Sequence, residues 1–80
     1  MMVVPYTSEL FEEDGQVAAL CPELNVSSYG DTSTGALASL KEAVELFLEE
    51  CKHMGTLDAV LEEAGYKRGQ GDRWMHRQAI

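Results

Sequence analysis

Carboxylates are the side chains in this sequence that could most readily do chemistry. The 80 residues include 14 Asp and Glu, two cysteines and two histidines. Two carboxylates that converge in a cleft can act as a general acid and a general base, because burial and a neighbouring charge shift their pKa values. Most acids here fall in predicted turns or on the outward face of a predicted helix, where they do not converge. We therefore expect no catalytic residue and no enzymatic activity.

The cysteines and histidines do not form the pattern of a metal site or a disulfide framework. Cys51 and His53 are two positions apart on a predicted helix, so their side chains diverge by about 200° and cannot hold one ion together. Cys21 and Cys51 form no CxxC pair and fall on the buried faces of a strand and a helix. We expect reduced, packed thiols, a His53 that favours the helix dipole, an exposed His76, and no metal or cofactor.

The net charge of −8 is distributed unevenly along the chain. Residues 1–65 contain 13 acids and two lysines and carry −11, whereas residues 66–80 contain four cations and one acid and carry +3. A folded acidic surface attracts basic partners and repels nucleic acid, so a basic protein is the simplest expected partner. The alternative is that the acidity only keeps a small protein soluble.

The basic C-terminal segment combines cations with an aromatic residue. Its members are Lys67, Arg68, Arg73, Trp74, His76 and Arg77. Stacking and phosphate contacts are how proteins hold single-stranded nucleic acids. We favour a structural role, because the only tryptophan of a small domain stabilises it more when packed, and these cations can pair with the acidic body. Binding of nucleic acid by this chain alone is therefore not expected.

The N-terminal part of the chain has the pattern of three antiparallel strands. β-Branched and aromatic residues run from Met2 to Phe11, and a second apolar run spans Val17 to Cys21. Asp14-Gly15 between these runs predicts a hairpin. Pro5 cannot donate a ladder hydrogen bond, so the first strand either lies at an edge there or has not yet begun to pair. Val26 to Tyr29 would form a short third strand.

A long amphipathic helix follows these strands. Its apolar residues recur at helical spacing and are expected to be buried, with acids on the opposite side. The inward residues are Leu37, Leu40, Ala43, Val44, Phe47, Leu48 and Cys51, and the outward acids are Glu42, Glu45 and Glu49. Thr32 is placed to cap the first turn, which should be weak because Gly35 stands where a capping box needs Glu or Gln. The helix should end near His53, at Gly55.

The remaining segments complete a single α+β domain over residues 1–80. Thr56 to Ala64 repeats the helical pattern and stops at Gly65, and Arg73 to Arg77 is predicted to be a strand. The order is β-β-β-α-α-β, with an antiparallel sheet of three or four strands and one long helix packed on one face. The second strand is apolar on both sides, so its other face would meet a second subunit. A domain this small buries only about 60–65% of its unfolded surface, which also favours a homo-oligomer.

The sequence shows no targeting segment and no membrane span. The first residues lack a basic stretch followed by a long apolar one, and no apolar run approaches the ~18 residues of a membrane helix. We expect a cytoplasmic protein with no membrane partner.

Four segments, in this order, resemble the HicB-type antitoxin family and span about half of the chain. They are Glu13–Leu24, Gly30–Thr32, Ala36–Leu37 and Lys41–Leu48. The resemblance implies a β-β-β-α-β domain of degraded ribonuclease H-like topology, which lacks the metal-binding acidic cluster. It also implies a toxin-antitoxin role in the cytoplasm, in which the antitoxin binds and masks a small basic HicA-like toxin that cleaves messenger RNA.

The chain departs from the family pattern in three places. Gly35 replaces a frequent acidic capping residue, and Asn25-Val26-Ser27 replaces a frequent Pro-Gly turn, so local structure is weakened there. Many members continue into a helix-turn-helix or ribbon-helix-helix domain that binds their operator. This sequence shows no such domain, so operator binding is not expected of it.

The leading hypothesis is an antitoxin-like protein-binding domain that neutralises a small basic mRNA-cleaving toxin by occlusion. The candidate contact acids are Glu12, Glu13 and Asp14 at the hairpin tip and Glu42, Glu45 and Glu49 on the outer helix face. The alternative is an orphan oligomeric HicB-like binding protein without a toxin partner. A small nuclease with ribonuclease H-like chemistry is a third class, and it would need a metal-binding acidic cluster that the sequence does not show.

Overall fold

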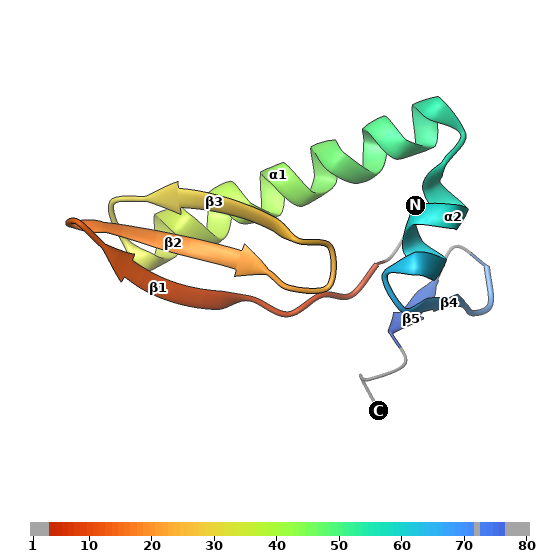
Figure 1. Cartoon of the computed structure of the whole chain (residues 1–80), viewed down its shortest axis with the longest axis horizontal. Helices are drawn as coiled ribbons and strands as arrows, with labels where there is room; N and C mark the ends of the chain where they lie inside the picture. Colours follow the sequence, from red (N-terminus) through yellow and green to blue (C-terminus); the bar gives the residue numbers. More distant parts are fainter. Residues whose placement is uncertain (1–3, 72, 77–80) are drawn as a thin grey trace.

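The computed structural model describes residues 4–71 and 73–76, and it has the α+β architecture expected from the sequence. Three strands come first, followed by a long helix, a short helix and two short strands (Figure 1). The strands are β1 (Glu9–Glu13), β2 (Gln16–Cys21), β3 (Val26–Gly30), β4 (Tyr66–Arg68) and β5 (Trp74–His76), and the helices are α1 (Ser33–Met54) and α2 (Leu57–Glu63). The predicted order is confirmed, with β4 as an additional strand.

The first three strands form an antiparallel sheet with β2 in the centre. The β1–β2 hairpin turns at Asp14 and Gly15, whose φ angles of 48° and 81° are those of a type I′ turn. This turn aligns Glu13 with Gln16 and confirms the predicted hairpin. β1 begins later than predicted, so Pro5 precedes the strand and does not interrupt its ladder. The predicted strand residues Met2, Val3 and Arg77 lie outside the described residues.

Both ends of α1 are capped by the residues that the sequence indicated. The Thr32 side-chain oxygen accepts a hydrogen bond from the Gly35 backbone N–H at 3.0 Å. At the other end Gly55 adopts a left-handed φ of 73°, and the Thr56 backbone N–H donates to the Cys51 carbonyl at 2.9 Å. This is the Schellman arrangement, which satisfies carbonyls that the helix itself cannot pair. Local capping chemistry therefore fixes the length of α1.

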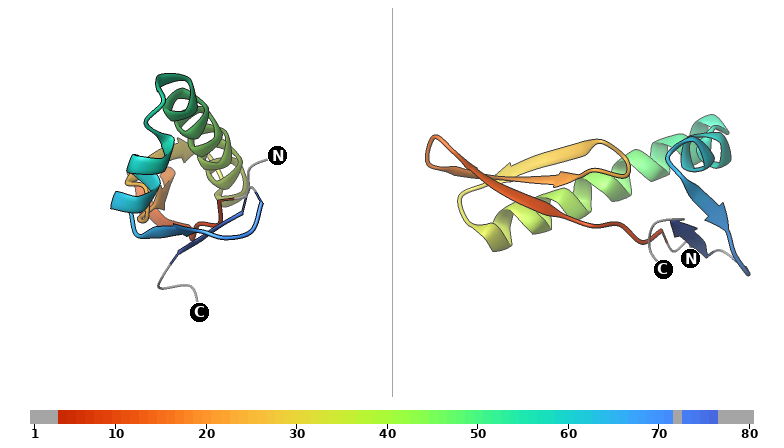
Figure 2. Two further views of the ribbon diagram at one scale, coloured as in Figure 1. Left: turned by 90° about the vertical axis from the view of Figure 1, so that its right-hand side faces the viewer. Right: turned by 60° about the horizontal axis from the view of Figure 1, so that its bottom comes forward.

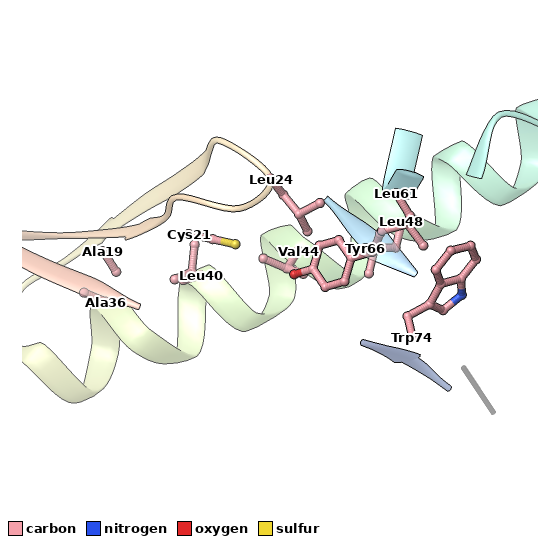
Figure 3. Close-up of a cluster of buried hydrophobic side chains, with 10 residues drawn as sticks. All are labelled: Ala19, Cys21, Leu24, Ala36, Leu40, Val44, Leu48, Leu61, Tyr66 and Trp74. Carbon is pink, nitrogen blue, oxygen red and sulfur yellow. The ribbon is translucent and has the colours of Figure 1, made fainter. Parts of the chain in front are cut away.

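The long helix packs on one face of the sheet, against β2 and β3, and β1 lies farthest from it (Figure 1). The buried residues of α1 are Ala36, Leu40, Val44, Leu48 and Cys51. With Ala19 and Cys21 of β2, the first four of them form the first half of the hydrophobic core (Figure 3). The predicted alternation of β2 is confirmed on this side of the sheet, because the β2 residues that face α1 pack into the core.

The helix-facing row begins at Ala36 and not, as predicted, at Leu37. Leu37 is 39% exposed, whereas Ala36 is fully buried. The first turn of α1 lies directly against Gly30 at the end of β3, and the small residue Ala36 stands at this close approach. Hydrophobic spacing alone does not reveal such a constraint, because it depends on the neighbouring strand.

The second half of the core lies at the far end of α1. β4 and β5 pair antiparallel and form a separate two-stranded sheet beside α2. Leu61, Tyr66 and Trp74 are buried there and belong to the same hydrophobic cluster as the residues under the first sheet (Figure 3). A strand at β4 was not predicted, because three residues are too few for a recognisable pattern of alternation. One continuous core along α1 therefore joins both sheets.

Gly30→Ala is expected to lower the free energy of unfolding by about 1–3 kcal/mol, the usual cost of overpacking. An added Cβ would lie 2.5 Å from the Ala36 nitrogen and 2.8 Å from the Gly35 carbonyl carbon, and backbone atoms cannot move aside without shifting α1. Urea denaturation followed by circular dichroism measures this change. Ser27→Ala, on the exposed side of the same strand, is the control and should change stability by less than about 0.5 kcal/mol. Equal stabilities for the two variants would contradict the tight contact.

Candidate partner-binding surface

β1 is an exposed edge of the three-stranded sheet. All five of its residues are exposed, and within residues 4–71 and 73–76 only β2 pairs with it. Directly opposed residues point to the same face of a sheet. The register therefore places Phe11 of β1, Ala18 of β2 and Tyr29 of β3 in one row. Because Ala19 faces α1, this row lies on the face turned away from the helix.

This face, here named the outer sheet face, has an apolar centre and an acidic margin. Its members are Glu9, Phe11, Glu13, Gln16, Ala18, Leu20, Ser27 and Tyr29. Phe11 and Tyr29 are 48% and 52% exposed, while Ala18 between them is only 8% exposed. The two aromatic residues flank the alanine across the sheet and remain open to solvent themselves. Exposed aromatic side chains that lie close together are typical anchors of protein interfaces.

The strands and turns of the first sheet contain acids but no basic residue of their own. The first basic residue in the sequence is Lys41, so the strands and turns of the first sheet contribute acids only. β1 alone carries Glu9, Glu12 and Glu13 around its two apolar residues. Like charges gathered on one surface create a potential that attracts a cationic partner.

The six acids predicted to contact a partner are all exposed, but they lie on two separate surfaces. The register places Glu13 on the outer sheet face and Glu12 on the opposite side of β1, and Asp14 occupies the hairpin turn. The other three, Glu42, Glu45 and Glu49, belong to α1. Helical spacing directs them away from the buried row and hence away from the sheet. A single partner-binding surface can therefore include either the hairpin acids or the helix acids, but not both sets.

Exposed apolar side chains accompany the helix acids as well. Leu46 and Met54 are each 66% exposed, and with Glu49, Glu50 and His53 they line a shallow hollow. All of these residues come from α1, so among the described residues one helix alone lines the hollow. Its described lining includes no Phe, Tyr or Trp. The outer sheet face is therefore the stronger candidate.

Among the acidic and aromatic residues of this surface, Glu13 was predicted to contact a partner, whereas Glu9, Phe11 and Tyr29 were not. The sequence did contain a signal for Phe11, because a two-residue turn at Asp14-Gly15 fixes the register of the hairpin and sets Phe11 opposite Ala18. The position of Tyr29 opposite Ala18 depends on the turn between β2 and β3, whose length the sequence did not define as clearly.

The N-terminal segment that leads into β1 is held in place by two side chains. The Glu23 carboxylate accepts hydrogen bonds from the Thr7 backbone N–H at 3.1 Å and from the Thr7 hydroxyl at 2.6 Å. The Tyr66 hydroxyl donates to the Pro5 carbonyl oxygen at 2.5 Å. The segment runs from β1 toward the β4–β5 pair (Figure 2). The residues directly before β1 are therefore anchored to the rest of the domain.

The surroundings of these contacts shift three pKa values. Burial alone would raise the pKa of Glu23, but the hydrogen bonds from Thr7 and from the backbone outweigh it, and the pKa is lowered. Burial, together with the negative charge of Glu23, raises the pKa of Cys21 to about 11. Burial and the same charge also raise the pKa of Tyr66. Cys21 and Tyr66 thus stay protonated at neutral pH, which makes Cys21 a poor nucleophile.

Several described residues of the basic C-terminal segment pack against the domain. Trp74 is buried, as expected, and Arg68 lies 5.1 Å from the centre of its ring while pairing with Asp58 at 2.9 Å. His76 is half-buried, and its Nε2 lies 3.0 Å from the Ala64 carbonyl oxygen, so the prediction of an exposed His76 is wrong. Stacking of a nucleic-acid base on Trp74 would require this packing to open.

The described residues offer no site for a metal ion, since no three of their His, Cys, Asp or Glu side chains gather closely enough to hold one. Cys21 and Cys51 are both buried and not bonded to each other, which confirms two packed thiols. In the same part of the chain, no helix has the length and apolarity that crossing a membrane requires.

Comparison with known proteins adds no assignment to this chain. No family model matches it, and no match is found among curated proteins or solved structures. The residues and their geometry are therefore the basis for a functional proposal.

Glu23→Gln is expected to weaken the destabilising effect of acid on this protein. A carboxyl group whose pKa is lowered on folding, here from an ordinary value of 4.5, stabilises the folded state above that value. The contribution is lost as the pH falls through the folded-state pKa. The free energy of unfolding, measured by urea titration at about pH 7 and about pH 3, should therefore fall less in the variant than in the wild type.

Glu9→Gln provides the matched control, because it removes a β1 carboxylate that takes no part in the contacts with Thr7. If both variants responded to acid equally, the hydrogen bonds of Glu23 would not explain the acid sensitivity.

Proposed function

We propose that this chain is a HicB-like, antitoxin-like domain that acts in the cytoplasm by binding and occluding a small basic toxin that cleaves messenger RNA. The observation that carries the proposal is the outer sheet face, where exposed Phe11 and Tyr29 lie with Glu9 and Glu13. A protein that cleaves RNA binds phosphates through a basic surface. An acidic surface with apolar anchors complements such a surface and competes with RNA for it.

The apolar and acidic residues of this surface have different roles in the proposal. Buried aromatic anchors supply most of the binding energy in many interfaces, whereas charges steer the encounter and discriminate between partners. Phe11 and Tyr29 would therefore hold the toxin, and the acids of β1 would favour a basic partner. The net charge of −8 would speed association with that partner and repel RNA.

Neutralisation by occlusion needs no chemistry from this chain. The protein would act stoichiometrically, by covering the RNA-binding surface of the toxin. The ordered segments that resemble the family coincide with the turns and strands that build this surface: Glu13–Leu24 contains the β1–β2 turn and all of β2, and Gly30–Thr32 ends β3 and caps α1. This agreement supports the assignment.

Self-association is a second element of the proposal. The exposed Leu46 and Met54 on α1 would be covered in a homo-oligomer, while the outer sheet face stays available to the toxin. An orphan oligomeric binding protein is the alternative function. The exposure of Phe11 and Tyr29 favours it when the acids around them are left out of account. Rescue from toxicity distinguishes the two functions, since the orphan protein would form a stable homo-oligomer and restore no growth.

Replacement of the β1 acids should abolish toxin neutralisation, whereas an equal change of charge on α1 should not. The two variants are the triple substitutions Glu9→Gln, Glu12→Gln, Glu13→Gln and Glu42→Gln, Glu45→Gln, Glu49→Gln. We expect wild type and the α1 triple variant to co-purify with a small basic protein encoded by the neighbouring reading frame and to restore growth when it is expressed. The β1 triple variant should bind at least about tenfold more weakly, because it loses its charge complementarity.

Two outcomes would contradict this proposal. If pull-downs capture no small basic protein and the neighbouring reading frames encode none, the antitoxin role is rejected and the orphan function replaces it. If both triple variants lose binding equally, net charge and not the position of the acids on β1 determines recognition.

A further inference from the structure

The backbone of β1 shows which of its groups are available to a partner. In a hairpin with a two-residue turn, the residues beside the turn form a hydrogen-bonded pair, and such pairs alternate along the ladder. Glu13, Phe11 and Glu9 therefore direct their N–H and C=O groups toward β2. Leu10 and Glu12 direct theirs to the other side, where no strand pairs with β1 among the described residues.

This edge lacks the usual obstacles to strand addition. β1 contains no proline, and its register with β2 runs through five consecutive pairs without a bulge. Charge is the one protective feature, with Glu9, Glu12 and Glu13 among the five residues. Like charges placed opposite each other destabilise a pair of strands. Two copies of β1 would therefore repel one another, whereas a basic strand would be attracted.

The apolar residues of β1 are placed to pack with an added strand on both faces of the sheet. Phe11 lies on the outer sheet face, and Leu10 lies on the side of α1. Leu10 is nevertheless 44% exposed, because α1 packs over β2 and β3 and does not extend to the edge. A strand beside β1 would cover part of each side chain. Its matching residues would be apolar next to Leu10 and Phe11.

We propose that β1 is a docking edge for a basic strand of the partner protein, which joins the sheet through the backbone groups of Leu10 and Glu12. Lys or Arg of this strand would lie beside Glu9, Glu12 and Glu13, and aliphatic residues would lie between them. The inference rests on the proposed function, since the partner is the basic protein proposed there. It specifies how that protein is held: by main-chain hydrogen bonds at the edge of the sheet.

Amide hydrogen exchange of the full chain, followed by NMR, tests this inference with a blocked peptide of sequence Lys-Lys-Val-Val-Lys. In antiparallel pairing its lysines face Glu13, Glu12 and Glu9, and its valines face Phe11 and Leu10. At about nine-tenths saturation, exchange at the Leu10 and Glu12 amides should slow about tenfold, because only the free tenth exchanges. The Phe11 amide, which already bonds to β2, should change less.

Methylation of peptide nitrogens provides a matched pair of controls. Methyl groups on the second and fourth residues remove the donors that face β1, whereas methyl groups on the third and fifth residues leave those donors in place. The first peptide should lose the protection of Leu10 and Glu12, and the second should keep it. A peptide in which glutamates replace the lysines should not bind.

Edge docking is overturned if the basic peptide fails to bind at millimolar concentration, if it binds without protecting Leu10 and Glu12, or if both methylated peptides protect them equally. None of these outcomes bears on whether a basic toxin is captured, which the pull-down of the whole partner decides separately. Failure of the edge and failure of the antitoxin role are thus distinguishable.

Discussion

The close contact between the end of β3 and the start of α1 is the constraint on which the rest of this fold depends. Gly30 brings the two backbones so near that a single added carbon would collide with Ala36. Small residues line this contact, and Ala19 and Ala36 are fully buried. A helix seated this closely lies over β2 and β3 and cannot also cover β1. The exposure of β1 is therefore a consequence of how α1 packs, and the sheet presents one strand that the helix does not shield.

Features with local causes were predictable from the sequence, and features set by distant neighbours were not. The hairpin at Asp14-Gly15 and the two caps of α1 depend on the conformational preferences of a few adjacent residues. The late start of β1, the exposure of Leu37 and the pairing of β4 with β5 depend on which other element lies alongside. Periodicity identifies the apolar side of an element, but it does not show how much of that side a neighbour covers.

The candidate site shows the same division. Exposure of the acids at the hairpin tip and on α1 was foreseen, because charged residues at turns and on the polar side of a helix remain in water. An apolar second face of β2 was foreseen, but the place of Phe11 and Tyr29 on it was not, because they share this face only through the register of three strands. In isolation each of them resembles an ordinary core residue of a strand. They stand out as candidate anchors only when the face that they share is known to have no helix over it.

The hydrogen bond between Tyr66 and Pro5 has a consequence for the order in which this molecule is completed during synthesis. The two residues are 61 positions apart, so the bond closes a loop that contains most of the chain. Contacts of long sequence separation form after local ones, because a large loop must first lose its conformational freedom. On a ribosome, β1, β2, β3 and α1 emerge before Tyr66 is available. Glu23 can hold Thr7 as soon as the first strands have formed, whereas Pro5, farther along the lead-in segment, is anchored only when Tyr66 arrives.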